Sequence, residues 1–310
     1  MKTAVITGIG GFVGKYLAAY LVSQGIAVFG FDRQGTQIIG AKTVTLDLLD
    51  PIALKAYIKE IKPDYIIHLA AQSSVKKSWD NPEETKQINI EGTRYLLDAI
   101  VKHSPTSKIL IVSSAEIYGI PTTVPITEKT PLNPNSPYGE SRLEQEKICQ
   151  EYIKKHNLTL VITRSFPHTG LGQSDQFVCS NFAKQIALIE AGKQEPLLSV
   201  GNLDAKRDFS DVRDIVKSYY LLITNPHAQG VYNICSGKSI AIADVLQKLL
   251  SYSKNSITVT PDPAKMRPSD IPNMLGSNSK FTALTGWKPE IHFDQTLREM
   301  LEWWRKETTK

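Results

Sequence analysis

The sequence predicts an α/β protein with a doubly wound parallel sheet and a smaller mixed α/β lobe toward the C-terminus. Short apolar runs alternate with helical patterns through the first half of the chain. The runs are apolar almost without interruption, which is typical of strands that helices cover on both faces. After about residue 166 the alternation weakens, and shorter segments separated by prolines replace it.

The elements can be placed in order along the chain. Strands are predicted at 3–7, 27–31, 42–46, 64–69, 108–113 and 158–163, with helices at 12–24, 51–61, 84–103 and 137–156. Further on, helices are predicted at 176–191, 211–224, 241–252 and 294–306, and short strands near 197–200, 231–235 and 256–260. The proline-rich region 261–279 is expected to be a long loop that covers a ligand.

This order predicts two units. Residues 1–165 are expected to form a Rossmann-type dinucleotide-binding domain, to which 207–235 returns. Residues 166–206 and 236–310 are expected to form a substrate-binding lobe. A chain of 310 residues is long enough for both, at roughly 150 residues each.

The amino-acid composition indicates which kinds of molecule the protein binds. Lys and Arg number 36 against 31 Asp and Glu, and the two signs are interleaved, so no basic stripe indicates a nucleic-acid partner. The net charge of +5 suits an anionic small molecule. No secretory signal and no apolar run of about 18 residues is visible, so we expect no membrane partner. Cys149, Cys179 and Cys235 show no metal or disulfide spacing, which predicts reduced cysteines, a cytoplasmic location and no metal.

A glycine-rich turn follows the first strand. Gly8, Gly11 and Gly14 give the pattern G-x-x-G-x-x-G between a predicted strand and a predicted helix. Such glycines permit a tight turn, let backbone amides approach a pyrophosphate, and allow close packing of helix on strand. The amides at the helix start favour an anion. The sequence therefore predicts a dinucleotide site, NAD(H) or NADP(H), over Gly8, Gly10, Gly11, Phe12, Val13 and Gly14.

Acidic and basic residues refine that site. Asp32 ends the second strand, where a carboxylate binds the adenosine ribose diol and repels a 2′-phosphate. Its neighbour Arg33 would attract that phosphate, so NAD(H) is favoured and NADP(H) stays open. Asp47 follows the third strand and is placed either to meet the adenine edge or to begin the helix at Pro51.

A candidate catalytic set lies on the fifth strand and the helix that follows it. Ser114 is expected at the carboxyl end of the strand, where parallel sheets bind ligands. Ser136-Pro137 predicts a helix start, which places Tyr138 and Arg142 one turn apart on one face. Adding hydride to a ketone builds negative charge on oxygen, and a phenol can protonate it if a cation stabilises the phenolate. Glu116 is a further acid–base candidate in this segment.

These motifs resemble the extended short-chain dehydrogenase/reductase family over essentially the whole chain. The resemblance rests on the glycine turn, His68-Leu69-Ala70-Ala71, Asn89, Ser114 with Tyr138-x-x-x-Arg142, and Arg207-Asp208-Phe209. The segment from Arg164 to Gln173 is similar to that of GDP-4-keto-6-deoxy-mannose reductases, whose product is GDP-D-rhamnose. The segments 177–186, 200–209, 267–270 and 285–287 also resemble these reductases.

The resemblance implies an enzyme that reduces C4 of a GDP-4-keto-6-deoxyhexose, and it implies further site residues. Cofactor contacts are implied for Leu48, Leu69, Ala70, Ala71, Ser113, Phe166 and His168, besides Tyr138 and Arg142. Substrate contacts are implied for Asn89, Phe177, Val178, Asn181, Lys184, Asn202, Arg207 and Arg267, besides Ser114 and Glu116. An arginine fork matches phosphate geometry, which supports the two arginines independently; a surface ion pair of Arg207 with Asp208 or Asp211 is the alternative. His68 is expected either near the cofactor or as a structural residue at the strand end.

Two positions depart from the family pattern. Arg142 stands where the family has lysine; it keeps the positive charge but does not realistically release a proton. Pro167 stands where these reductases usually have asparagine, so one amide contact is missing.

Three functions therefore stay open: the ketoreductase, a GDP-mannose 4,6-dehydratase or 4-epimerase, and a non-catalytic dinucleotide-binding sensor. The resemblance also implies a homodimer through helices 84–103 and 137–156. These helices carry apolar residues that either contact a second copy or cover the sheet of their own chain: Ile90, Leu97, Ile100, Ile148 and Tyr152.

Overall fold

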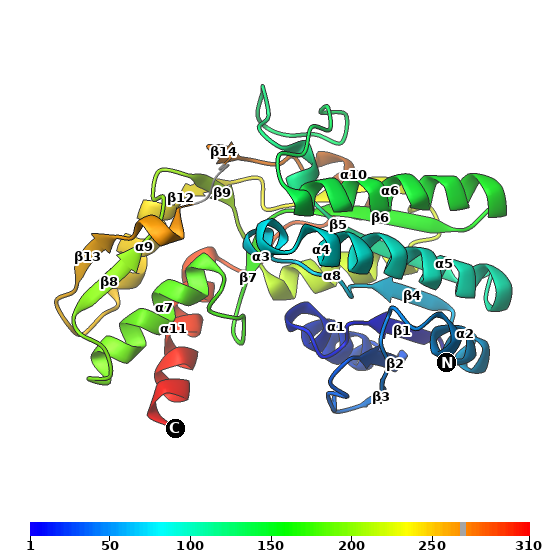
Figure 1. Cartoon of the computed structure of the whole chain (residues 1–310), viewed down its shortest axis with the longest axis horizontal. Coiled ribbons are helices and arrows are strands. Elements are labelled where there is room, and N and C mark those ends of the chain that lie inside the picture. Colours follow the sequence, from blue (N-terminus) through cyan, green and yellow to red (C-terminus); the bar gives the residue numbers. More distant parts are fainter. Residues whose placement is uncertain (267–270) are drawn as a thin grey trace.

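The computed structural model describes residues 1–266 and 271–310 and shows a seven-stranded parallel sheet, which confirms the predicted fold class (Figure 1). The strand order is β11-β6-β5-β4-β1-β2-β3. The strands are β1 (Thr3–Thr7), β2 (Ala27–Asp32), β3 (Ala41–Thr45), β4 (Tyr65–His68), β5 (Lys108–Ser114), β6 (Leu160–Ser165) and β11 (Gly230–Ile234). The order reverses between β1 and β4, and ligands of such sheets bind beyond the carboxyl ends of the strands at this point.

Helices cover both faces of the sheet. They include α1 (Phe12–Ser23), α2 (Pro51–Ile61), α5 (Gly92–His103), α6 (Pro137–His156) and α8 (Val212–Thr224). Neighbouring side chains of β1 enter different cores: Ile6 packs with α1 and α8, whereas Val5 packs with α2, α5 and α6. Because side chains alternate along a strand, the two helix groups lie on opposite faces.

Helix predictions in this unit are close to the structure. The range 137–156 is confirmed to the residue, with the Ser136 hydroxyl accepting a hydrogen bond from the Gly139 amide at 3.1 Å and Pro137 in the first turn. The range 84–103 is three consecutive pieces rather than one helix. These are α4 (Pro82–Lys86), a π-helical turn η1 (Gln87–Glu91) and α5. Apolar periodicity does not reveal a π turn, because one extra residue per turn changes the hydrogen bonding more than the pattern.

The C-terminal part builds a second, smaller lobe, at the left of Figure 1. Its elements are α7 (Val178–Glu190), β8 (Leu197–Val200), β9 (Lys206–Asp208), β12 (Ser239–Ala241), α9 (Ile242–Ser251), β13 (Thr258–Pro261), β14 (Asn273–Met274) and α11 (Phe293–Thr309). A core of its own joins α7, α9 and α11 through side chains such as Phe182, Leu246 and Leu297. This core is separate from those of the large sheet, to which α8 and β11 belong. The proposed boundaries differ from this in one respect, because Phe281 and Trp287, assigned to the smaller lobe, pack in a core of the large sheet.

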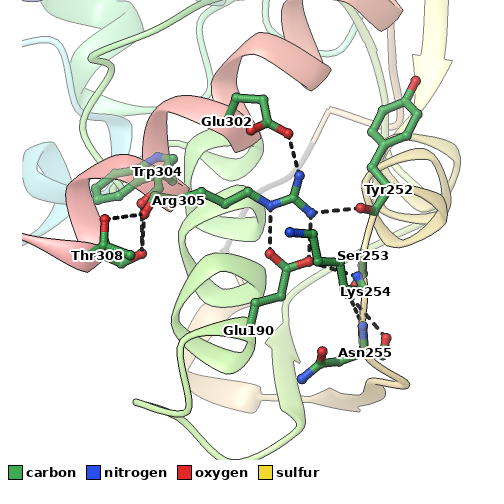
Figure 2. A network of polar contacts seen from close by, with 10 residues as sticks. Glu190, Tyr252, Ser253, Lys254, Asn255, Glu302, Trp304, Arg305 and Thr308 are labelled. Carbon is green, nitrogen blue, oxygen red and sulfur yellow. Dashed lines mark hydrogen bonds and ion pairs between the residues drawn. The ribbon is translucent and has the colours of Figure 1, made fainter.

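One network of polar contacts joins three helices of this lobe (Figure 2). Arg305 of α11 donates to both carboxylate oxygens of Glu190 at 2.6 and 2.7 Å and to the carbonyl of Tyr252 at 2.8 Å. Such a two-pronged contact fixes both the distance and the orientation of the guanidinium. It therefore ties together the C-terminal ends of α7, α9 and α11.

The structure corrects the expectation that residues 261–279 form one long loop. It contains a 3₁₀ turn η3 (Pro263–Lys265) and β14, which pairs in parallel with β9; residues 267–270 lie outside the described part. The partner of β14 is Lys206–Arg207, more than 60 residues away in sequence, so no local pattern could predict the strand. Other short elements not predicted are α3 (Val75–Asp80), η2 (Ala115–Tyr118), β7 (His168–Thr169), β10 (Ser210–Asp211) and α10 (Ser279–Thr285).

Within residues 1–266 and 271–310, no helix combines the length and apolarity needed to cross a bilayer. The same residues contain no group of three or more His, Cys, Asp or Glu side chains that could hold a metal ion.

Candidate active site

The glycine turn lies between β1 and α1 with the geometry that its spacing predicts. Gly8 has a φ of +70°, which a residue with a side chain rarely adopts. A Cβ at Gly14 would lie 2.4 Å from the carbonyl oxygen of Gly8, so only glycine lets α1 start this close to the turn. The N-cap of α1 is Gly11, and no side chain caps the helix. The first amides of α1 are therefore suited to an anion.

Asp32 lies beside this turn. Its Oδ1 accepts the amides of Gln34 at 2.6 Å and Thr36 at 3.3 Å. Burial alone would raise the pKa of Asp32, but these hydrogen bonds outweigh it and hold the pKa below its ordinary value. A Cβ at Gly10 would come within 2.0 Å of Oδ2, so glycine is required where the turn passes the carboxylate.

Three further residues were expected at the adenosine end of the dinucleotide, namely Arg33, Asp47 and Leu48. Arg33 and Asp47 are exposed, and Leu48 is buried beneath α5. Asp47 accepts the amide of Leu49 at 2.9 Å, whereas Asp50 caps α2. The alternative in which Asp47 begins that helix is therefore wrong, because Asp50 stands directly before Pro51 and takes the first free amides.

Ser114 ends β5 and begins the short helix η2. Its hydroxyl oxygen accepts the amide of Glu116 at 3.2 Å. A hydroxyl has one hydrogen and two lone pairs, so this bond leaves the hydrogen for an acceptor in the site. Glu116 lies in η2, half-buried, directly beyond the strand end.

Tyr138 and Arg142 form one unit at the start of α6. Tyr138 is 7% exposed and Arg142 is 5% exposed, and the guanidinium carbon lies 5.2 Å from the centre of the tyrosine ring. This is the distance of a cation–π contact. The guanidinium also donates to the carbonyl of Val112 on β5 at 3.3 Å and to Gln145 at 3.0 Å. The predicted pairing of phenol and cation is thus present, through the face of the ring.

Three buried polar atoms at this edge of the sheet have no hydrogen-bond partner among the described residues. They are Asp32 Oδ2, Ser113 Oγ and Arg142 Nε. A buried polar group without a partner costs about 1–3 kcal/mol. All three come from residues predicted to contact a dinucleotide, so the donors and acceptors present fit that class of ligand, with Asp32 as the acceptor for a ribose hydroxyl.

The His68-Leu69-Ala70-Ala71 segment continues from β4 beside the glycine turn. The amides of Leu69 and Ala70 donate to Thr7 Oγ1 at 3.2 and 3.0 Å. His68 is 1% exposed and bonds Thr7 and Thr93 through its two nitrogens. Of the two expectations for His68, the structural one therefore describes its contacts.

Asn89 and Phe166 lie deeper than the resemblance implies. Asn89 is fully buried in the π turn; its amide group bonds the backbone of Gln72 at 2.9 and 3.1 Å and Ser141 Oγ at 2.9 Å. These contacts use its acceptor and both donors, so we assign Asn89 to joining these segments rather than to substrate. The Phe166 side chain is fully buried in a small core with Met274, and its carbonyl bonds His168 Nδ1 at 2.9 Å.

Four residues for which the resemblance implies substrate contacts lie at the start of α7. Phe177 is 38% exposed, Val178 and Asn181 are half-buried, and Lys184 pairs with Asp175 at 2.6 Å. Asn181 donates to the carbonyl of Asp175 at 3.1 Å. An exposed aromatic ring beside amide groups suits a flat polar ligand such as a nucleotide base.

Arg207 and Asp208 lie on β9. Arg207 is 8% exposed and donates to the carbonyls of Lys206 and Ile271 at 2.9 and 2.6 Å. Asp208 accepts the amides of Ser236, Gly237 and Gly276, and burial raises its pKa to about 6. Asp211 bonds Arg213 and Thr296. Asn202 is exposed, and Arg267 lies outside the described residues.

Sequence reasoning missed the residues that hold the Tyr138–Arg142 pair. Ser78 of α3 accepts the amide of Tyr138 at 3.1 Å, and Gln145 and Thr93 lie behind Arg142. Only Gln145, one turn beyond Arg142, gave a signal in the sequence. The other contacts bridge about 50–60 positions of the chain.

This chain is similar to known proteins in both sequence and structure. The family model described as GDP-mannose 4,6 dehydratase matches residues 5–300. GDP-6-deoxy-D-mannose reductase of Pseudomonas aeruginosa is 35% identical over 96% of this chain and 96% of that protein. GDP-mannose 4,6 dehydratase of Homo sapiens is 30% identical over 97% of this chain and 90% of that protein. The structure of RMD from Pseudomonas aeruginosa complexed with NADPH superimposes with a TM-score of 0.89 at 33% identity, covering 99% of this chain and 100% of that one.

Proposed function

The chain belongs to the GDP-mannose 4,6-dehydratase family, and we propose that it is an NAD(P)H-dependent reductase of the C4 ketone of a GDP-4-keto-6-deoxyhexose, giving a GDP-6-deoxyhexose such as GDP-D-rhamnose. The observation that carries this proposal is the pair of Tyr138 and Arg142 beside Ser114, at the carboxyl edge of a sheet whose glycine turn suits a dinucleotide. Membership of the family and the similarity to a reductase supply the class of substrate.

The roles of the residues follow from their chemistry. A reduced nicotinamide supplies the hydride when the dinucleotide is bound. Ser114 donates a hydrogen bond to the ketone oxygen and orients it, since its own contact uses only a lone pair. Tyr138 gives its proton to that oxygen as negative charge develops there. Arg142 stabilises the phenolate left behind, because its guanidinium lies against the same ring.

The remaining predicted residues are proposed as binding groups. The turn from Gly8 to Gly14, with Asp32, would hold the adenosine and pyrophosphate of NAD(H) or NADP(H). Phe177, Val178, Asn181 and Lys184 would meet the nucleotide end of the sugar nucleotide, and Arg207 and Arg267 its diphosphate.

Product mass decides between reduction and the nearest alternative. We expect GDP-4-keto-6-deoxymannose with NADH or NADPH to gain two hydrogens while the nucleotide is oxidised. The family model and Glu116 favour a second candidate, a 4,6-dehydratase, which would convert GDP-mannose to a product lighter by one water without added cofactor. An unchanged mass of both sugar nucleotides would leave the 4-epimerase, which conserves mass, and the non-catalytic sensor. Chromatographic separation of the C4 epimers then distinguishes these two.

We also propose a cytoplasmic homodimer. Leu97, Ile100 and Ile148 are buried against the sheet, so the expectation that they contact a second copy is wrong; they belong to the core. Ile90 and Tyr152 are only partly buried and remain candidates. A monomer mass by light scattering at micromolar concentration would contradict the dimer. All three cysteines are buried and unpaired, which supports a reducing compartment.

A further inference from the structure

The guanidinium of Arg142 is held from behind by a buried side chain that the proposed chemistry does not use. Nη1 donates to Gln145 Oε1 at 3.0 Å, and Gln145 is fully buried. On its other side the guanidinium meets the Tyr138 ring. Gln145 and Tyr138 thus hold Arg142 between them, on the same helix.

The orientation of the Gln145 amide is fixed by Thr93. Gln145 Nε2 donates to Thr93 Oγ1 at 2.7 Å, so Oε1 must face Arg142. The Thr93 hydroxyl in turn donates to the carbonyl of Asn89 at 2.7 Å. Its oxygen therefore acts only as an acceptor toward Gln145 and His68. The π turn before α5 places Thr93 and Asn89 in this arrangement.

The last link leads to the end of β1. His68 Nε2 lies 3.0 Å from Thr93 Oγ1, and His68 Nδ1 lies 2.8 Å from Thr7 Oγ1. Thr93 can only accept, so His68 carries its proton on Nε2 and accepts from the Thr7 hydroxyl on Nδ1. The amides of Leu69 and Ala70 fill the acceptor side of Thr7. Donation therefore runs from Thr7 through a neutral His68 to Thr93. It also runs from Arg142 through Gln145 to Thr93, whose own hydrogen goes to the Asn89 carbonyl.

We propose that Gln145 is a positioning residue for Arg142, held in place by Thr93 and His68, and that this network makes position 142 suited to arginine. The inference rests on the proposed function, because the purpose of a positioned cation is to support Tyr138. The terminal Nη1 that reaches Gln145 has no counterpart in a shorter lysine side chain. Lysine at 142 would leave the buried Gln145 Oε1 without its donor, which is unfavourable in a site that excludes water.

A double-mutant cycle tests the coupling. Gln145→Leu should lower kcat about tenfold, with little change in KM for the sugar nucleotide. Arg142→Lys should lower kcat as well, and adding Gln145→Leu to it should cost little more, because the donor that Gln145 served is gone. Ser107→Ala is the matched control: it removes a buried hydrogen bond to the Pro63 carbonyl at the opposite edge of the sheet and should lower stability alone. Additive losses in the cycle would overturn the proposal.

A second readout needs no turnover. Unfolding free energies of wild type, Gln145→Leu, Arg142→Lys and the double variant, measured by urea denaturation, form a second cycle. Gln145→Leu should lose less stability in the Arg142→Lys background than in wild type, because the Nη1 donor that Gln145 accepts is already gone. Thr93→Val, which removes the partner of Gln145 Nε2, takes the place of Gln145→Leu if that variant fails to fold. Equal losses in both backgrounds would refute the positioning role. If the wild type reduces no sugar nucleotide, the proposed function fails while this cycle still judges Gln145.

Discussion

At the scale of single residues, Tyr138 is the group on which we expect turnover to depend. Tyr138→Phe keeps the ring against Arg142 but removes the proton, so we expect kcat to fall about 10²–10⁴-fold with NAD(P)H affinity nearly unchanged. Steady-state kinetics and fluorescence titration of the dinucleotide measure the two effects. Tyr57→Phe is the control, since the Tyr57 hydroxyl donates to the Gly30 carbonyl of β2 and has no part in the proposed chemistry. Retained activity in Tyr138→Phe would remove Tyr138 from the chemistry.

Asp32 is the residue that we expect to govern the choice of dinucleotide. Its Oδ2 lies beside Gly10 without a hydrogen-bond partner among the described residues, which suits a ribose hydroxyl and disfavours a 2′-phosphate. Asp32→Ala should therefore raise the ratio of NADPH to NADH affinity about tenfold or more, which is about 1.4 kcal/mol. Dissociation constants for both nucleotides check this, and an unchanged ratio would place the 2′ position away from Asp32.

At this scale, a feature of the site could be predicted from the sequence when the residues that form it lie close together along the chain. The glycine turn, Asp32 and the Tyr138–Arg142 pair are local patterns, and each lies where the pattern places it. Asn89 was placed too near the substrate, since its partners Gln72 and Ser141 are 17 and 52 positions away. Gln145 was missed for the same reason: its role comes from Thr93, on another helix.

At the scale of elements, the start of α6 matters most because it carries the tyrosine. Ser136→Ala removes the cap on the Gly139 amide and should cost about 1 kcal/mol of unfolding free energy. It should also lower kcat several-fold, since the frayed turn includes Tyr138. Asp50→Ala removes a comparable cap from α2, a helix that does not carry the tyrosine, and should lower stability while kcat at saturating nucleotide stays unchanged. Urea unfolding with parallel kinetics separates the two; equal kinetics in both variants would show that the cap does not position the tyrosine.

Helices and strands could be predicted where nearby residues in the sequence determine them. Apolar periodicity placed both ends of α2 and α6, and the Ser136 cap marked the start of α6. In contrast, β9, β12 and β14 form a sheet whose strands are far apart in sequence. Two- and three-residue strands carry no periodicity of their own. The π turn was missed because it differs from an α-helix in hydrogen bonding rather than in composition.

At the scale of the whole molecule, two buried groups give stability opposite dependences on pH. Burial, together with the charge of Arg142, lowers the pKa of His68 to about 3, against 6.5 when unfolded. The unfolded chain then binds more protons below pH 6.5, so this contribution is present above that pH and is lost on acidification. Burial raises the pKa of Asp208 to about 6 from 3.8, so the folded chain binds the extra proton, and this contribution grows as pH falls from 6 toward 4.

Variants separate the two contributions. Between pH 7 and pH 5, His68 should cost about 2 kcal/mol of unfolding free energy and Asp208 should return about 1 kcal/mol, at about 1.4 kcal/mol for each unit of pKa shift. His68→Gln should therefore flatten the fall in stability over this range, and Asp208→Asn should steepen it. Urea unfolding of the three proteins at both pH values measures the differences. Parallel curves for wild type and His68→Gln would mean that burial does not hold the imidazole neutral, and the hydrogen-bond directions assigned between Thr7, His68 and Thr93 would then be untenable.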